Sequence, residues 1–502
     1  MSECQRRKTN VQQWVTLLSA FLEILLFTGF LLCWASLVFV YKVNGYFSGH
    51  CTNITTKNHS VYVDCRGQDN DFSKVLLVAT FLNSACYFPS GFVFDHCGTM
   101  VTRIIAISLY TCGTLIVILS NKETSVLLYP AEVFLGLAGS MFFMTNIQVG
   151  NLFYTHHSTI IGIYEGLQTT SAGIFVIIKL LQEAGVSVHS SFIFLSVCSI
   201  IPIIRTLFLL PSGHIPYPLP ETYTYGIRCP IQRGGREERS EQKNPENGRV
   251  HNKNMEKGIK LVALPCEQDG AQTQHEPKEK EVTFRSCVFS GLFMFTLMWY
   301  SIVYFCQWLY LCTLNPMLTR LAKGDKKLVS HYTNVFAVIQ MSGILFAPAV
   351  GLIMDRNKNR PLAAGETRQE SDIRSSIICL FLSALQCFLF CMCFTIPVLH
   401  LQYLTFFLQT INNCFMFVTE QSFIAVVFPM THYGKLTGLI SLVTTVLLLL
   451  QFPILHIINF QLHNDPLYVN VVITAVSLLT FIQPIYVSLH CKKLASQRKD
   501  RC

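Results

Sequence analysis

The stretch Pro89-Ser-Gly-Phe-Val-Phe-Asp-His-Cys-Gly-Thr-Met-Val-Thr-Arg103 lies between two apolar segments, each long enough to cross a lipid bilayer. Gly91 leaves room for a close helix contact, and Asp95 follows one helical turn later, where the first apolar run ends. Gly98 allows the chain to turn back, and Arg103 opens the next run. A carboxylate with a nearby cation at a membrane surface is a natural latch, because each charge needs a partner where water is scarce. We therefore predict that these four residues form a gate.

The same pattern returns downstream as Gly351-Leu-Ile-Met-Asp355-Arg356, which again closes one apolar run and precedes another. A second pair of stretches supports the repeat: Thr155-His156 with Gly162, and Thr431-His432 with Gly438. Two copies at equivalent junctions indicate that the chain consists of two similar halves. We therefore predict that Gly351, Asp355 and Arg356 are the gating residues of the second half.

The pattern Gly-x-x-x-Asp-Arg/His-x-Gly, in a loop after a second helix, resembles the signature of the major facilitator superfamily. The first copy has His96 where the family usually has Arg or Lys, whereas the second copy has the usual Asp355-Arg356. The resemblance implies an all-α polytopic membrane protein in which two six-helix bundles rock about a central solute site.

The composition agrees with a membrane protein. Of the 502 residues, 51% are hydrophobic and only 13% are charged, whereas soluble domains carry roughly 25% charged residues. The net charge of +9 lies in the termini and loops and not on one face, which argues against nucleic-acid binding. We expect the lipid bilayer to surround the chain, with the basic segments on the cytoplasmic side.

Apolar runs of roughly bilayer length divide the chain into twelve predicted helices. They span residues 14–41, 72–95, 102–120, 124–150, 158–182, 190–210, 287–314, 330–354, 375–396, 400–425, 433–458 and 467–489. With the repeat, they predict two pseudo-symmetric six-helix bundles, at residues 1–210 and 286–490. Residues 211–285 are polar and highly charged, which predicts a largely disordered cytoplasmic linker. Residues 491–502 are predicted to be a basic cytoplasmic tail.

The polar loop at residues 42–71 is expected on the outside of the membrane. It contains two glycosylation sequons, at Asn53 and Asn58. Cys51 and Cys65 share this oxidising side, and the residues alone leave open whether they form a disulfide or remain free thiols.

Polar and aromatic residues within the helices are candidates for the central solute site, because a buried polar group needs a partner. Tyr300, Tyr304 and Gln307 lie at i, i+4 and i+7 and therefore share one helix face. Aromatic rings with amide donors and acceptors suit a flat, neutral heterocycle. Further candidates are Gln168, Gln409 and Asn413. The alternative is that these amides only bridge neighbouring helices.

Four glutamates lie within the apolar runs: Glu23, Glu132, Glu165 and Glu420. A carboxyl group inside a bilayer suggests a function by default. Glu165 and Glu420 stand near helix ends, whereas Glu23 and Glu132 lie deeper, and we select Glu23 as a candidate for the solute site. The alternative is that Glu23 is protonated and hydrogen-bonds to a neighbouring helix.

The sequence contains no His-Glu-x-x-His, no Walker-type phosphate loop and no Gly-x-Ser-x-Gly elbow. We therefore expect neither an enzyme nor an ATP-driven pump, and no cofactor or metal. A solute would move by facilitated diffusion or by coupling to an ion gradient. The sequence leaves the oligomeric state open.

Longer segments in both halves are similar to the solute carrier 43 family. They include Trp34-Ala-Ser-Leu-Val-Phe-Val40, Asn146-Ile-Gln-Val-Gly-Asn-Leu-Phe153, Gly213-His-Ile-Pro-Tyr-Pro-Leu-Pro220 and Asn464-Asp-Pro-Leu-Tyr-Val-Asn470. The last two look most like the nucleobase-transporting branch. The resemblance implies sodium-independent, bidirectional movement of purine bases such as adenine, guanine and hypoxanthine across the plasma membrane. The alternatives are facilitated transport of large neutral amino acids, and a non-transporting membrane sensor or scaffold that signals through the linker.

Overall fold

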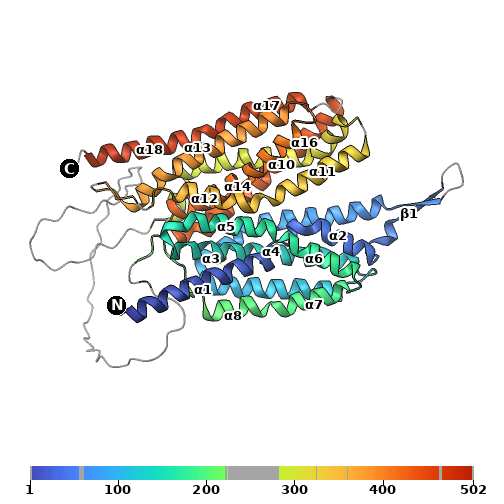
Figure 1. Cartoon of the computed structure of the whole chain (residues 1–502), viewed down its shortest axis with the longest axis horizontal. Helices are drawn as coiled ribbons and strands as arrows, with labels where there is room; N and C mark the ends of the chain where they lie inside the picture. The colour runs from blue at the N-terminus through green and yellow to red at the C-terminus, as the bar shows by residue number, and fades with distance from the viewer. Residues whose placement is uncertain are drawn as a thin grey trace, which may run out of the picture.

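The protein forms two helical bundles that lie side by side, with the helices along the long axis of the molecule (Figure 1). The structure is a computed structural model that describes residues 3–55, 61–220, 223 and 282–499, apart from residues 324, 359, 364 and 463–465. Both chain termini lie at one end of the molecule, and the β-hairpin lies at the other (Figure 1). We call the end that carries Asp95, Asp355 and the termini the latch end, and the opposite end the hairpin end.

The first bundle is built from the helices before residue 210. In chain order they are α1 (Glu3–Phe27), η1 (Phe30–Cys33), α2 (Trp34–Val43), η2 (Ser48–His50), α3 (Arg66–Leu119), η3 (Ser125–Leu127), α4 (Leu128–Ile147), η4 (Gln148–Leu152), η5 (Tyr154–His156), α5 (His157–Thr170), α6 (Ala172–Glu183), α7 (Val188–Cys198) and α8 (Ile200–Phe208).

The second bundle is built from the helices after residue 283. They are α9 (Phe284–Val288), α10 (Gly291–Leu321), α11 (Lys326–Met341), α12 (Gly343–Asp355), α13 (Arg368–Thr395), α14 (Gln402–Val427), η6 (Met430–His432), α15 (Tyr433–Leu448), α16 (Gln451–His456), η7 (Ile457–Gln461), α17 (Leu467–Ser477), η8 (Leu478–Phe481) and α18 (Ile482–Lys499).

Seven segments of the described chain are long and apolar enough to cross a membrane, or eight if the bent pair α11 and α12 is one span. One of the seven, Asn70–Leu119, has 50 residues and is interrupted at Gly98, so it comprises two spans. A single helix of that length would be about 75 Å long, far more than the bilayer core. The remaining predicted helices correspond to the pair α1 and α2, the pair α5 and α6, and α14, which are not among those seven or eight segments. With them, the described helices match all twelve predicted ranges and form two bundles.

Several helices that the sequence predicts as continuous are broken in the structure, among them 14–41 and 158–182. The break between α1 and α2 contains Gly29, and the break between α5 and α6 contains Ser171. The two breaks touch, because a Cβ on Gly29 would lie only 1.6 Å from the Ser171 hydroxyl oxygen. The hydrophobic pattern carried no signal for this contact, since the two residues are distant in sequence.

The loop predicted at residues 42–71 contains a short hairpin, which sequence patterning did not indicate. Strands β1 (Thr52–Thr55) and β2 (Val61–Asp64) pair in antiparallel register, with Thr52 opposite Asp64. A disulfide joins Cys51 to Cys65 at the base of this hairpin, which resolves the question that the sequence left open. Asn53 lies on β1, and Asn58 falls outside the described residues.

Large apolar side chains cover the outside of both bundles. Phe289 and Leu345 are each 72% exposed, and Phe194 and Val197 are each 67% exposed. Apolar surface of this extent is costly in water and favourable in hydrocarbon. The exterior therefore fits a protein that sits in a bilayer.

The beginning of the predicted linker is folded against the bundles. Residues 211–220 pack across the latch end, and Ile215 is fully buried there. The prediction of a largely disordered segment is therefore wrong for these residues. None of these ten residues is Asp, Glu, Lys or Arg, and their four prolines restrict the unfolded chain, which lowers the conformational entropy lost on ordering. Residues 224–281 of the predicted linker lie outside the described residues.

Candidate functional site

Asp95 lies at the latch end of the first bundle and contacts the second bundle. Its Oδ1 accepts the backbone N–H of Gly434 at 2.8 Å, and its Oδ2 accepts that of Lys435 at 2.7 Å. These two amides belong to the first turn of α15, where helix geometry leaves N–H groups unpaired and the helix dipole attracts negative charge. The predicted gating carboxylate therefore caps a helix of the opposite bundle.

Asp355 makes the equivalent contact in the opposite direction. Its carboxylate accepts the backbone N–H groups of Ser158 at 3.1 Å and Thr159 at 2.7 Å, in the first turn of α5. The Thr159 hydroxyl donates to it at 2.7 Å, and Lys358 Nζ lies 3.0 Å away. The repeat seen in the sequence is therefore a repeat of geometry, with each bundle capping one helix of the other.

Glycines next to the two carboxylates allow the helices to cross at backbone contact. A Cβ on Gly91 would lie 1.9 Å from the carbonyl oxygen of Gly434, and one on Gly351 would lie 2.3 Å from that of Ser158. Gly98 has a φ of +79°, a conformation that side chains other than hydrogen disfavour. These contacts close the latch end between α3 and α15 and between α5 and α12.

The cations of the two motifs do not have the partners that the sequence suggested. Arg103 points into its own bundle and bonds to Glu23, so the expectation that it pairs with Asp95 is wrong. Arg356 is exposed and donates to the carbonyl oxygen of Ile353 at 2.5 Å, and the cation on Asp355 is Lys358 instead. Motif spacing could not distinguish these arrangements, because long basic side chains reach several neighbours.

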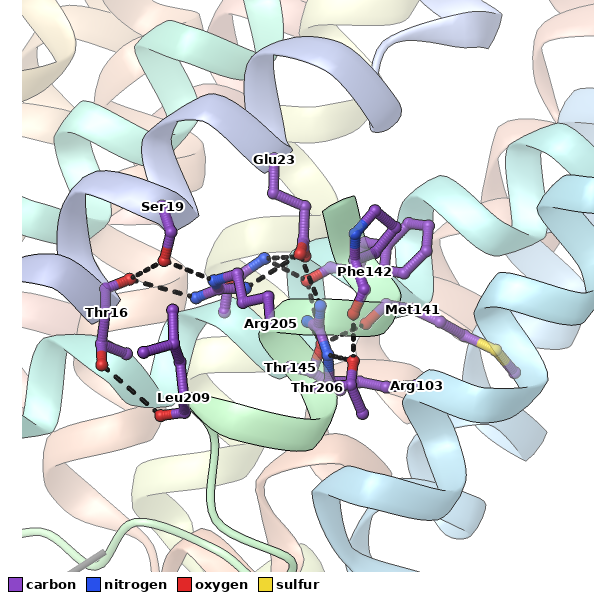
Figure 2. A network of polar contacts seen from close by, with 12 residues as sticks. Thr16, Ser19, Glu23, Arg103, Met141, Phe142, Thr145, Arg205, Thr206 and Leu209 are labelled. Atoms are coloured by element: carbon purple, nitrogen blue, oxygen red, sulfur yellow. Dashed lines mark hydrogen bonds and ion pairs between the residues drawn. The ribbon is translucent and has the colours of Figure 1, made fainter. Parts of the chain in front are cut away.

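Glu23 lies in a buried ion-pair network inside the first bundle (Figure 2). Its Oε2 lies 2.5 Å from an Arg103 nitrogen and 3.1 Å from an Arg205 nitrogen, and its Oε1 accepts from Asn146 at 2.9 Å. All of the charged side chains are at most 1% exposed. Both Glu23 oxygens therefore bond to protein groups, which does not favour Glu23 as a solute ligand. The ion pairs with Arg103 and Arg205 also differ from the alternative of a protonated Glu23 that hydrogen-bonds to a neighbouring helix.

The predicted face of α10 lies between the bundles and against α14. The rings of Tyr300 and Tyr304 are stacked, with centroids 5.7 Å apart. Gln307 donates to the Asn413 side chain at 3.3 Å and accepts from Asn412 at 3.0 Å. These amides therefore bridge two helices in this conformation, which is the alternative that the sequence analysis kept open.

The two remaining predicted amides, Gln168 and Gln409, lie on different helices. Gln409 of α14 accepts a hydrogen bond from Gln340 of α11, so it too bridges neighbouring helices. Gln168 lies half-buried on α5, and its backbone carbonyl accepts from Ser171 next to the break in that helix. The structure therefore brings Gln307 and Asn413 together and keeps Gln168 in the other bundle.

Two glutamates that the sequence analysis set aside as near helix ends are buried where the bundles meet. Glu165 of α5 is 8% exposed, Glu420 of α14 is 2% exposed, and the two are electrostatic neighbours. Tyr87 and Tyr300 are electrostatic neighbours of both carboxyls. Sequence reasoning missed this cluster because its members come from four helices of both bundles.

One group of thiols could hold a soft metal ion among the described residues. The sulfur atoms of Cys306, Cys387 and Cys391 lie within 4.8 Å of one another, and all three residues are buried. They join α10 to α13 within the second bundle. Buried cysteines also pack well as small apolar residues, and this cluster has no part in the gate described above.

Residues 69–447 match the Major Facilitator Superfamily. The fold agrees with that match at the level of solved structures. The crystal structure of a bacterial homologue of iron transporter ferroportin in outward-facing state superposes with a TM-score of 0.52 at 12% identity, covering 94% of this chain and 99% of that one. The human organic anion transporter MFSD10 (TETRAN) gives a TM-score of 0.52 at 10% identity, with the same coverage. The chain belongs to the major facilitator superfamily, and it is a multi-pass membrane transporter and not an enzyme.

A full-length relative narrows this assignment. The chain is 39% identical to equilibrative nucleobase transporter 1 of Bos taurus over 490 residues, which cover 96% of this chain and 97% of the relative. It is 26% identical to large neutral amino acids transporter small subunit 3 of Mus musculus and of Homo sapiens, again over nearly the full length. Within the superfamily, the resemblance to the solute carrier 43 family and its nucleobase-transporting branch is confirmed.

Proposed function

We propose that this protein carries purine nucleobases such as adenine, guanine and hypoxanthine across the plasma membrane by facilitated, sodium-independent transport. The observation that carries the proposal is the 39% identity, over nearly the full length of both chains, to a protein named equilibrative nucleobase transporter 1. The glycosylation sequons and the disulfide fit a hairpin end that faces outward. The latch end, with both termini, then faces the cytoplasm.

The solute site in this proposal lies between the bundles, next to the stacked pair Tyr300 and Tyr304. A purine is flat and aromatic, and stacking on such a ring contributes about 1–3 kcal/mol per base in nucleic-acid sites. Gln307 and Asn413, which bond to each other here, would exchange that bond for the donor and acceptor edge of the base. Gln168 and Gln409 are the further candidates.

The buried carboxyls of Glu165 and Glu420 extend this site. Purines present both N–H donors and ring-nitrogen acceptors, and a carboxyl group can accept from such donors or, when protonated, donate to such acceptors. The two groups belong to different bundles, so a base could bond to both only at certain relative positions of the bundles. Such a contact differs between the two conformations, which is what coupling of binding to movement requires.

Transport proceeds in this proposal by alternating access. The contacts of Asp95 with α15 and of Asp355 with α5 hold the latch end closed. When the hydrogen bonds of Asp95 to α15 and of Asp355 to α5 break, the bundles separate at the latch end and release the solute there. Gly91 and Gly351 allow the closed state to form, because only glycine fits at the two crossings.

Transport of large neutral amino acids is the competing function, supported by the 26% identity to proteins of that name. An amino acid is a zwitterion and needs a cation or a helix N-terminus for its carboxylate. The site proposed above instead carries two carboxyls, two tyrosines and amides. This composition suits a neutral base better than a zwitterion.

The test is uptake of labelled adenine and labelled leucine into cells that express the chain, with and without sodium. Adenine uptake that is indifferent to sodium is the expected result. Leucine uptake without adenine uptake would transfer the protein to the amino-acid branch. If neither adenine nor leucine enters cells that carry the protein on their surface, the remaining function is that of a non-transporting membrane sensor or scaffold.

A further inference from the structure

Residues 211–220 cross the latch end, and we call them the strap. Five hydrogen bonds tie the strap to the first bundle. Thr99 Oγ1 donates to the Gly213 carbonyl at 2.7 Å, and the Met100 N–H donates to the Ser212 carbonyl at 3.2 Å. The Ile215 N–H donates to Gln148 Oε1 at 2.9 Å, Asn151 Nδ2 donates to the Ile215 carbonyl at 2.7 Å, and His214 Nε2 bonds to the Asp95 carbonyl at 3.3 Å. The ring of His214 also packs edge-on against Phe94, with centroids 4.7 Å apart. The strap is therefore anchored to the part of α3 that carries Asp95, next to the kink at Gly98.

The strap contacts the second bundle through Tyr217. Its hydroxyl donates to Asp372 Oδ2 on α13 at 2.7 Å. The Tyr154 hydroxyl, from the first bundle, donates to Oδ1 of the same carboxylate at 3.3 Å. The Asp372 carboxylate of the second bundle therefore accepts hydrogen bonds from two tyrosines, one in the strap and one in the first bundle.

Charge and burial favour this arrangement. Lys358 Nζ lies 5.3 Å from the ring centroids of both Tyr154 and Tyr217, and the same nitrogen lies 3.0 Å from Asp355. Burial and the nearby Asp372 carboxylate raise the pKa of the Tyr217 hydroxyl, and similar causes raise the pKa of Tyr154 to about 12. Both hydroxyls therefore stay protonated and can donate at neutral pH. Through Lys358 they share a cation with the Asp355 contact.

We propose that the strap moves with the first bundle and closes the latch end through Tyr217 and Asp372, as a third contact beside those of Asp95 and Asp355. When α5 separates from α12, the five bonds between the strap and the first bundle stay intact, because both partners of each bond lie on the same side. The two tyrosine bonds to Asp372 must break. The strap then opens and closes together with the first bundle. This role does not depend on which solute is carried.

Hydrogen exchange of the purified protein in nanodiscs tests the contact without any transport assay. The variants Tyr217→Phe and Tyr154→Phe remove the hydroxyls and keep the rings. We expect amides at Ser158 and Thr159, which bond to Asp355, to exchange about tenfold faster, since a hydrogen bond to a charged group is lost. Tyr403→Phe is the matched control, because the Tyr403 hydroxyl contacts His331 within the second bundle. Unchanged exchange in both variants, or equal acceleration in the control, would overturn the proposal.

Cross-linking tests which bundle the strap follows. A short bifunctional thiol reagent should join Tyr217→Cys to Asp372→Cys and hold the latch end closed, with slow exchange at Ser158 and no uptake. The same reagent on Met100→Cys with Ser212→Cys should leave both unchanged, because the hydrogen bond between these residues is made by backbone atoms and both belong to one rigid body in the proposal. The chain without added cysteines, treated with the reagent, corrects for its native thiols. The strap would be rejected as a gate if the cross-linked Tyr217→Cys and Asp372→Cys pair still showed fast exchange at Ser158 and uptake. Loss of uptake in the cross-linked control pair would reject it as well. If the protein carries no adenine, the exchange measurement still decides this point.

Discussion

The carboxylate of Asp95 accepts the backbone N–H of Gly434 at 2.8 Å, although 339 residues separate the two in the chain. Asp355 repeats this relationship with Ser158 across the same boundary. Each carboxylate thus satisfies amides at the start of a helix that belongs to the other bundle, so charge and helix dipole act together only while the latch end is closed. The pair of contacts explains why one motif occurs once in each half.

Asp355→Asn should slow transport several-fold while the amount of protein at the cell surface stays the same. The amide keeps one acceptor oxygen but loses the charge that strengthens the three hydrogen bonds and the Lys358 ion pair, each worth roughly 1.5–3 kcal/mol when charge-assisted. Initial uptake rates and surface biotinylation measure the two quantities.

The matched control for this substitution is Asp325→Asn. Asp325 caps α11 through the amides of Lys327 and Leu328, and all three residues lie in the second bundle. Its substitution should leave the uptake rate unchanged. Equal uptake by wild type and Asp355→Asn would remove the gating role of Asp355.

Gly351→Ala should prevent the latch end from closing. The added Cβ would lie 2.3 Å from the Ser158 carbonyl oxygen and 2.5 Å from Thr159 Cα, and backbone atoms cannot move aside as a flexible side chain can. Overpacking of this kind costs typically 1–3 kcal/mol, which shifts a two-state equilibrium by roughly 5- to 150-fold. The uptake rate should fall and hydrogen exchange at the Ser158 amide should become faster, because both depend on closure of the latch end. Gly49→Ala is the control, because a Cβ there meets nothing within 4 Å, and a similar defect in it would show that the effect is not local.

The sequence predicted the fold well because the bilayer imposes a simple rule on it. A crossing needs a run of about 20 apolar residues, and such runs are visible without tertiary information. The motif repeat also selected Asp95 and Asp355, the two carboxylates that each cap a helix of the other bundle. Their partners were not predictable, since the amides of α15 and α5 become neighbours only when the bundles associate.

The errors in the sequence analysis share one physical cause. Arg205 lies 182 positions after Glu23, and no local pattern indicates that the two meet in the core of one bundle. The strap was misjudged for a related reason: it was grouped with the charged segment after it, and no local pattern indicates that Ile215 and Tyr217 bond to distant residues. Local patterns predict elements, and packing decides partners.

Glu23→Gln should destabilise the protein without a selective loss of solute affinity. Its removal leaves the buried cations Arg103 and Arg205 without their carboxylate, and breaking a buried ion pair in this way costs about 3–5 kcal/mol. Thermal unfolding in detergent should show a clear drop, whereas the KM for uptake by the surviving protein should stay near that of wild type.

Glu132→Gln serves as the comparison for Glu23, because both oxygens of Glu132 are buried without a hydrogen-bond partner among the described residues. Replacement of that carboxyl by an amide should change the unfolding temperature little. A normal unfolding temperature combined with a raised KM in Glu23→Gln would return Glu23 to the solute site.

Tyr304→Ala should weaken adenine uptake more than Tyr304→Phe does. The phenylalanine variant keeps a ring that stacks on Tyr300 and on a bound base, whereas alanine loses a contribution of about 1–3 kcal/mol, or roughly 5- to 150-fold in affinity. The KM for labelled adenine, at matched surface expression, measures the difference. Tyr403→Phe and Tyr403→Ala form the control pair, because Tyr403 stacks on Tyr332 within the second bundle. Equal losses in the two Tyr304 variants would assign its role to the hydroxyl group, and the base would then be held by hydrogen bonding and not by stacking at this position.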